Sequence, residues 1–239
     1  MIALLKGELS KAVSTRTMLA FVLGGVAFAV LNAVIVGAAS GTLDEVSEKR
    51  EALSCLPILL LVWGLVGAAG EYRHRTAAPA ALVARHGRAT LLFARLVAYA
   101  LTGLGIGVLI SLAGLAVGLP LLSSQPGPDL GLADLGSVVA GNLAACVLSA
   151  TMGAAIGALV RNQIVGVVLL LVVNFAVVPL VAGAQETLMN LTPFGASSVL
   201  SGMSHNTTIT VAAAAAVLTG WTFVVGFVAL VSERQRDLA

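Results

Sequence analysis

Six apolar stretches of about 20 residues dominate this sequence, and none of them contains Asp, Glu, Lys or Arg. A helix needs roughly 20 apolar residues to cross the hydrocarbon core of a bilayer. Charged residues make up only 10% of the chain, against about 25% in a soluble domain. We therefore expect an all-α integral membrane protein with one transmembrane domain, residues 1–239, and six transmembrane helices. The stretches cover residues 18–39, 53–70, 96–122, 135–160, 164–184 and 209–232.

The segments between these stretches carry Lys and Arg unevenly. The N-terminal segment, the second and fourth connections and the C-terminal tail together hold 11 of these residues, and the other connections hold only Lys49 and Arg50. Cytoplasmic loops carry the excess of Lys and Arg, so we expect both termini in the cytoplasm. The preference for Ala, Gly, Val and Arg over Lys is typical of a GC-rich bacterium. We expect a multi-pass protein of the bacterial plasma (inner) membrane.

The first 16 residues have the pattern of an amphipathic helix. Ile2, Leu5, Leu9 and Val13 repeat at helical spacing, while polar residues such as Lys6 and Lys11 fill the other face. This pattern predicts a short helix lying in the cytoplasmic interface. A flexible basic tail is the alternative.

The second connection is longer than a hairpin needs. Pro79 suits the first position of a helix, and Gly87 suits the left-handed position just past a helix end. These residues predict a helix of about two turns over residues 79–86, with Leu82 and Val83 as its apolar contacts. A helix this short is not stable alone in water, so it needs the membrane or a partner protein to lie on.

The pattern GEYRHRT…LVARHGR…ARL in this connection resembles the first cytoplasmic loop of ABC type-2 transporter permeases. The N-terminal helix and the six-span layout are also similar to that family over essentially the whole chain. The resemblance implies that Thr76 through Arg88 form a coupling helix that docks on a separate ATPase subunit, and that Glu71 pairs with basic residues and relays ATPase motion to the spans. Anchoring at lipid phosphates is the alternative role for the arginines. The implied coupling residues are Glu71, Tyr72, Arg73, His74, Arg75, Thr76, Pro79, Leu82, Val83, Arg85, Gly87 and Arg88.

Residues 185–208, on the outer side, are too apolar for a solvated loop. With Pro193 and Gly195 interrupting them, we expect two short helices that dip into the outer leaflet, where such permeases have re-entrant helices. Simple interfacial anchoring is the alternative. The candidate residues of an outer lid are Leu191, Pro193, Phe194 and Leu200.

Polar residues are few within the spans. Asn32, Asn142 and Asn174, together with Phe175, are the candidates for a substrate path. The alternative for the asparagines is a hydrogen bond to a neighbouring helix. Pro57 and Pro179 are candidates for kinks in the second and fifth spans. Cys55 and Cys146 are expected to be small buried hydrophobic residues.

Several activities have no support in the sequence. Gradient-driven transporters usually need ionisable residues inside their spans, and the six stretches have none. There is no G-x-x-x-x-G-K-[ST] phosphate loop and no catalytic or metal-ligand constellation, so we do not expect an enzyme. ATP and Mg would bind in the partner ATPase.

The resemblance implies a permease subunit of an exporter that moves a hydrophobic drug, antibiotic or peptide by alternating access. Its expected partners are an ABC ATPase subunit, a second permease copy (identical or a paralogue) and membrane lipids, and not nucleic acid. A gradient-driven transporter or channel is one alternative. A non-transporting immunity or sensor subunit is the other.

Overall fold

The computed structural model describes residues 2–39, 43, 45–73, 87–184, 186–203 and 209–237. Every regular element in these residues is a helix. Their bounds, in chain order, are α1 Ile2–Ser14, α2 Arg16–Ala39, α3 Val46–Ala52, α4 Pro57–Arg73, α6 Arg88–Ser123, α7 Leu132–Val160, α8 Gln163–Val172, the π-helix η1 Val173–Val177, α9 Val178–Ala184, α10 Glu186–Asn190, α11 Pro193–Leu200 and α12 Val211–Asp237.

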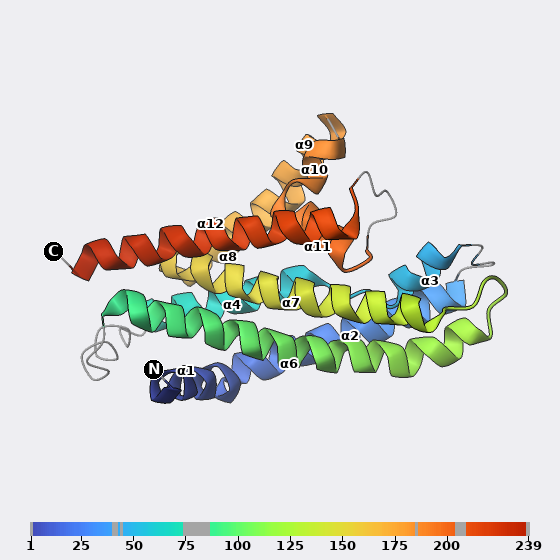
Figure 1. The fold of residues 1–239 in the computed structure, drawn as a ribbon, viewed down its shortest axis with the longest axis horizontal. Coiled ribbons are helices and arrows are strands. Elements are labelled where there is room, and N and C mark those ends of the chain that lie inside the picture. The colour runs from blue at the N-terminus through green and yellow to red at the C-terminus, as the bar shows by residue number, and fades with distance from the viewer. Residues whose placement is uncertain are drawn as a thin grey trace.

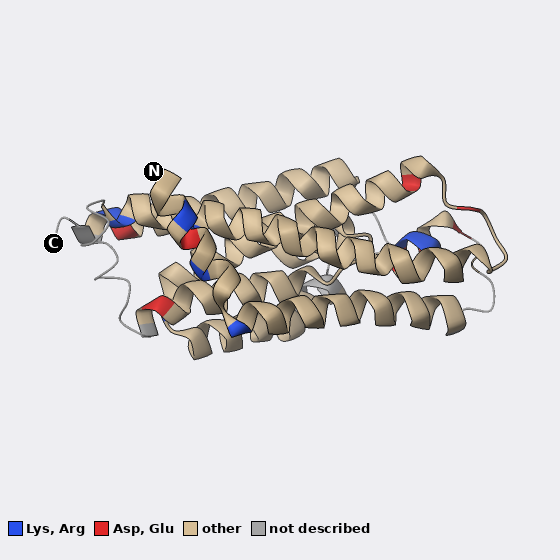
Figure 2. Ribbon diagram, turned by 90° about the horizontal axis from the view of Figure 1, so that it is seen from below, with Lys and Arg blue, Asp and Glu red and all other residues tan. Residues whose placement is uncertain are grey.

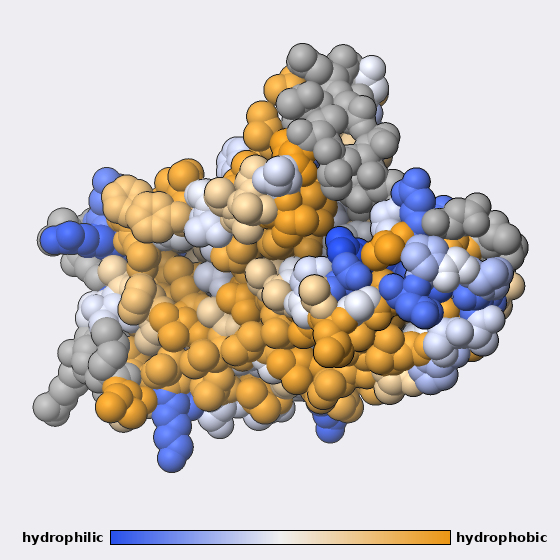
Figure 3. Space-filling model, turned by 45° about the vertical axis from the view of Figure 1, so that its right-hand side comes forward, coloured by the Kyte–Doolittle hydropathy of each residue, from blue (hydrophilic) through white to orange (hydrophobic). Residues whose placement is uncertain are grey.

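Six helical segments of the described chain are long and apolar enough to cross a membrane. They are α2, α3 with α4, α6, α7, α8 continuing through η1 into α9, and α12. This confirms the prediction of an all-helical, multi-pass membrane protein with six candidate spans. Figure 3 shows the expected surface, with a broad hydrophobic band between more polar ends. Large apolar side chains such as Phe223 and Leu180 are mostly exposed, as contact with lipid allows.

The chain begins and ends at the same end of the bundle. Helix α1, the start of α6 and the C-terminal end of α12 all lie there (Figure 1). We call this the basic end, because Figure 2 shows most Lys and Arg residues of the described chain gathered at it. The arrangement agrees with an even number of spans. That the basic end faces the cytoplasm stays a prediction.

Helices α4 and α7 pack against each other with their backbones in contact. A Cβ atom on Gly153 or Gly157 of α7 would collide with the backbone oxygen of Leu61 or Leu65 of α4. From the other side, a Cβ on Gly64 would collide with the backbone of α7 at Ala150. The two helix backbones therefore touch, as they do where small residues line a contact between membrane helices.

The second span begins with α3 at Val46, earlier than the predicted residue 53. Helix α4 starts at Pro57 rather than at residue 53, because residues 53–56 are irregular and separate it from α3. Pro57 is the first residue of α4, where its missing N–H costs nothing, so it starts this helix instead of kinking it.

In the fifth span, a π-helical turn over Val173–Val177 ends two residues before Pro179. Such turns occur where the regular hydrogen-bond ladder is interrupted. Beyond it, α9 and α10 project away from the other helices (Figure 1).

The third span also begins earlier than predicted, at Arg88 instead of residue 96. We expected Arg95 in the connecting loop, and this was wrong. Arg95 lies inside α6 with only 3% of its side chain exposed. The helix continues through this charge because the carboxylates of Glu8 and Glu71 compensate it.

Candidate functional site: ion-pair clusters at the end of α4

Helix α4 ends at Glu71, Tyr72 and Arg73, immediately before the predicted coupling segment. His74, Arg75, Thr76, Pro79, Leu82, Val83 and Arg85 lie outside the described residues. The chain is described again at Gly87, which forms the N-cap of α6 and precedes Arg88. Gly87 has a φ of −59°, so the left-handed conformation predicted for it was wrong. Of the predicted coupling residues, the structure therefore describes Glu71, Tyr72 and Arg73 before the segment, and Gly87 and Arg88 at its end.

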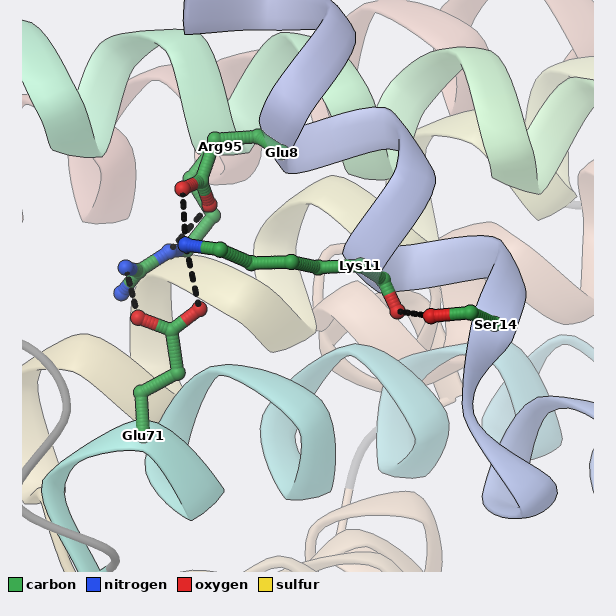
Figure 4. Close-up of polar contacts among 5 residues, drawn as sticks. All are labelled: Glu8, Lys11, Ser14, Glu71 and Arg95. Carbon is green, nitrogen blue, oxygen red and sulfur yellow. Dashed lines mark hydrogen bonds and ion pairs between the residues drawn. The ribbon is translucent and has the colours of Figure 1, made fainter. Parts of the chain in front are cut away.

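Four charged residues from three helices form the first cluster, which we call the Arg95 cluster (Figure 4). Arg95 of α6 donates from Nε to Glu8 Oε2 of α1 at 3.1 Å and from Nη2 to Glu71 Oε2 of α4. Lys11 of α1 completes the cluster, with its Nζ 2.6 Å from Glu8 Oε1 and 3.7 Å from Glu71 Oε1. Two acidic and two basic groups balance each other, which compensates the cost of burying them.

The Arg95 cluster connects the N-terminal helix α1 to the bundle. Residues 2–14 are helical, as predicted, but Glu8 is buried against α6. Helix α1 is therefore fixed to the bundle by a charged residue on the face that packs against α6, in addition to its amphipathic pattern. Whether its other face lies in a membrane interface stays a prediction.

Tyr72 belongs to a second cluster, the Glu233 cluster, which joins α4, α7 and α12. The Tyr72 hydroxyl donates to Glu233 Oε1 at 2.8 Å, and Arg161 Nη2 donates to the same oxygen. The Arg161 guanidinium also lies over the Tyr72 ring, 4.6 Å from its centroid, in a cation–π contact. Glu233 is buried, so its carboxylate depends on these donors.

Arg161 occupies a position at the end of α7 that usually suits glycine. Its φ of 57° is left-handed, and its N–H closes the helix on Gly157 O at 2.9 Å. The contacts with Glu233 and Tyr72 hold a long side chain at this C-cap. Asn162 then starts α8, since its Oδ1 accepts from the N–H groups of Ile164 and Val165. The turn formed by Arg161 and Asn162 therefore places the Arg161 side chain in the Glu233 cluster and starts the fifth span.

A cavity of about 520 Å³ opens beside the Arg95 cluster. Its wall includes Glu8, Lys11 and Glu71 from the cluster, and Tyr99 and Gly67 from deeper in α6 and α4. A Cβ on Gly67 would collide with the Tyr99 hydroxyl, so glycine is needed for the close approach of this ring. The cavity thus has a charged rim at the basic end and a more apolar interior between the helices.

The predicted path residues Asn32 and Asn142 instead bind the backbone where the second span is interrupted. Asn142 of α7 accepts from Cys55 N at 3.1 Å and donates to Leu53 O at 3.0 Å. Asn32 of α2 donates to Glu51 O at 2.8 Å. Asn142 lies ten residues into α7, which is about 15 Å along the helix. At such depth irregular backbone needs partners from the protein, and the alternative role given to these asparagines fits this geometry.

The other two path candidates do not join them. Asn174 and Phe175 lie in η1, and 71% of the Phe175 side chain is exposed. The structure therefore separates the four residues into two groups, and their role in a substrate path stays a prediction.

We expect Asn142→Leu to destabilise the protein by about 1–3 kcal/mol, because Cys55 N–H and Leu53 C=O would remain buried without a partner. The free energy of unfolding, measured by SDS titration in mixed micelles, checks this. Asn174→Leu is the matched control and is expected to change this free energy little. Equal stability of the two variants would contradict the role given to Asn142.

Near the predicted outer lid, the chain forms the short helices α10 and α11. The interruption falls at Leu191 and Thr192: Thr192 is the N-cap of α11 and accepts from Gly195 N, while Pro193 is the first helical residue. Pro193 therefore starts a helix instead of breaking one. Leu200 is buried, Phe194 is half-buried, and Leu191 O accepts from Trp221 Nε1 of α12. Whether these helices enter the outer leaflet stays a prediction.

At the end opposite the basic end, two cations of α3 are tied to other helices. Lys49 is buried and donates from Nζ to Leu122 O and Gln125 O, at 3.3 and 3.4 Å. Arg50 pairs with Asp134 at the start of α7. These contacts fix α3 to the ends of α6 and α7. Cys55 and Cys146 are fully buried, as predicted, with their sulfur atoms 3.8 Å apart.

Sequence reasoning missed most of both clusters. Glu71 was expected to pair with basic residues, but its partners Arg95 and Lys11, and the role of Glu8, were not identified. Arg161 was counted only as a charge of the short fourth connection, and Glu233 was not singled out. One signal was available, because Glu8 is the single acidic residue in an otherwise basic N-terminal segment.

The described residues contain no group of three or more His, Cys, Asp or Glu that could hold a metal ion. No protein-family model matches the chain, and no curated protein matches it. The resemblance to type-2 permeases therefore stays a prediction that rests on the sequence patterns given above.

Proposed function

We propose that this chain is the membrane-spanning permease subunit of an ATP-binding-cassette exporter that works with a separate ATPase subunit. The observation that carries the proposal is the position of two adjacent residues at the end of α4. Glu71 is tied to α1 and α6, while Tyr72 is tied to α12 and lies under Arg161 of α7. Both residues directly precede the basic segment that resembles an ATPase-docking loop. A displacement of that segment would thus be passed to most of the bundle.

The interruption before α4 supports the same proposal. Because residues 53–56 are irregular, α4 can tilt against α3, which is held at the opposite end by Lys49 and Arg50. In the proposed cycle, ATP closes the ATPase dimer, the docking segments move, and the end of α4 follows. The cavity at the basic end then closes while the opposite end opens. ATP and Mg bind in the ATPase subunits, and a second permease copy completes the pathway.

The distribution of charge favours ATP over an ion gradient as the energy source. Both clusters lie at one end of the spans, and their acidic groups are each paired with arginine. The apolar stretches between the two ends of the bundle carry no Asp, Glu, Lys or Arg. A proton path would need titratable groups across the membrane. A hydrophobic drug, antibiotic or peptide leaving a bacterial cell is the proposed cargo.

The double variant Leu82→Asp/Val83→Asp is expected to lose association with the ATPase subunit, because two carboxylates would replace the apolar contacts of the docking segment. Co-purification of the ATPase from mild detergent, relative to the amount of inserted permease, measures this. Leu132→Asp is the control, since Leu132 is 89% exposed at the opposite end. Normal association of the double variant would contradict docking through this segment.

A further inference from the structure

A membrane-facing groove runs between α6 and α12, away from the two clusters. It has a volume of about 330 Å³. Phe93 of α6 forms one wall, Phe223 and Phe227 of α12 form the other, and Leu148 and Thr151 of α7 contribute from between these helices. The two phenylalanine rings of α12 are stacked at a centroid distance of 6.4 Å, and both are more than half exposed. The groove therefore opens toward the region where lipid chains lie.

Three threonines line the groove, and two of them bind carbonyl groups of their own helices. The Thr151 hydroxyl donates to Val147 O at 2.7 Å, and the Thr222 hydroxyl donates to Leu218 O at 2.8 Å. Both hydroxyl groups are thus used by the carbonyls of their own helices. Their hydrogens are not available to an occupant, so the lining suits a hydrocarbon chain better than a polar ligand.

Toward the basic end the groove continues into a second pocket of about 340 Å³. The two share Phe93, Phe227 and Leu230, and the second pocket adds Thr90 and Arg234. Arg234 is exposed, and Thr90 lies in the first turn of α6, where N–H groups without helical partners favour an anion. The combined surface is a hydrocarbon groove with a cation at one mouth. This is the complement of an amphiphile with an anionic head.

We propose that this groove is a binding site for an anionic phospholipid of the leaflet at the basic end. One acyl chain lies along α6 and α12, and the phosphate contacts the Arg234 guanidinium, whose planar fork suits phosphate oxygens. A neutral helix of a second copy would fill the apolar part but would leave Arg234 without an anion. The site does not depend on the ATP-driven function proposed above.

The test counts phosphatidylglycerol and phosphatidylcholine bound to the purified full chain by native mass spectrometry across a lipid titration. The wild type is expected to hold one phosphatidylglycerol about tenfold more tightly than phosphatidylcholine, as one charge-assisted contact allows. Arg234→Gln should remove this preference by weakening phosphatidylglycerol binding more than phosphatidylcholine binding, because the choline group already neutralises the phosphate of phosphatidylcholine. Persistence of the preference in Arg234→Gln would overturn the proposal.

A second variant tests the chain-binding part. Gly226 lines the groove, and a Cβ there would meet only Leu96 Cδ1 at 3.8 Å, so Gly226→Leu fills the groove without a backbone collision. It should lose both lipids, whereas Gly220→Leu, on the same helix with open space at its Cβ, should keep them. Equal lipid binding by the two variants overturns the proposal. The proposal is also overturned if the wild type is a dimer and Gly226→Leu alone makes it monomeric, because a second copy would then fill the groove. If Gly226→Leu fails to fold, the Arg234→Gln result decides.

Discussion

Replacement of Arg95 by alanine is expected to destabilise the helix bundle by about 3–5 kcal/mol, the cost of breaking a buried ion pair by removing one partner. The reason is geometric. Arg95 donates to both Glu8 and Glu71, so its removal takes a donor from two carboxylates at once, and Glu8 is buried. The loss is also expected to release α1 from α6, since Glu8 would no longer have its buried partner. The free energy of unfolding by SDS titration in mixed micelles measures the first effect.

The matched control for this prediction is Arg16→Ala. Arg16 begins α2 at the same end, its side chain is exposed, and no ion pair of Arg16 occurs within the described part of the chain. Its replacement is expected to change stability by less than about 0.5 kcal/mol. Protease sensitivity of residues 2–14 adds a local measurement, which should rise only in Arg95→Ala. If both arginine variants unfold at the same SDS fraction, the Arg95 cluster does not hold the bundle.

Gly153→Leu is expected to destabilise the bundle by about 3 kcal/mol, the upper end of the usual range for overpacking. The atoms that its side chain would meet belong to the backbone of α4 at Leu61, which cannot move aside as a side chain can. The two helices would have to separate along their whole contact. The close contacts at Gly64 and Gly157 would then be lost as well. We expect the variant to insert in the membrane yet to unfold at a clearly lower SDS fraction.

Gly105→Leu is the control for the glycine contact. Gly105 lies in α6, is exposed, and a Cβ there meets nothing within 4 Å. Its replacement should leave the unfolding transition in place, because the added side chain faces lipid. A stable Gly153→Leu variant would contradict the backbone contact between α4 and α7.

The six candidate spans were predictable from the sequence because hydrophobic length alone determines them. The start of the third span was not, since Arg95 ends the apolar pattern although the helix continues through it. A charge of this kind is tolerated only where distant residues compensate it, and Glu8 lies 87 positions away. Local patterns carry no information about such a partner.

The asparagines also show that local sequence patterns do not reveal a distant partner. Sequence reasoning left two roles open for Asn142, the lining of a path or a hydrogen bond to a neighbouring helix. The structure shows the second role. The Asn142 side chain binds the backbone N–H of Cys55 and the backbone C=O of Leu53, where the second span is interrupted. Pro57 was a local signal for a break in this span, but Leu53, Ser54 and Cys55 continue the apolar run and do not indicate irregular backbone. The partner that satisfies this backbone lies on another helix, 87 positions or more away in the sequence.

Purification of the tagged chain from its native membranes in a mild detergent tests most directly the proposal that an ATPase drives this chain. Quantitative mass spectrometry then identifies the proteins that accompany it and their stoichiometry. We expect a soluble protein with a G-x-x-x-x-G-K-[ST] phosphate loop, present in equal number to the permease. An intact and folded wild-type chain that no such protein accompanies, under conditions that preserve a known transporter complex from the same membranes, would contradict the proposed function.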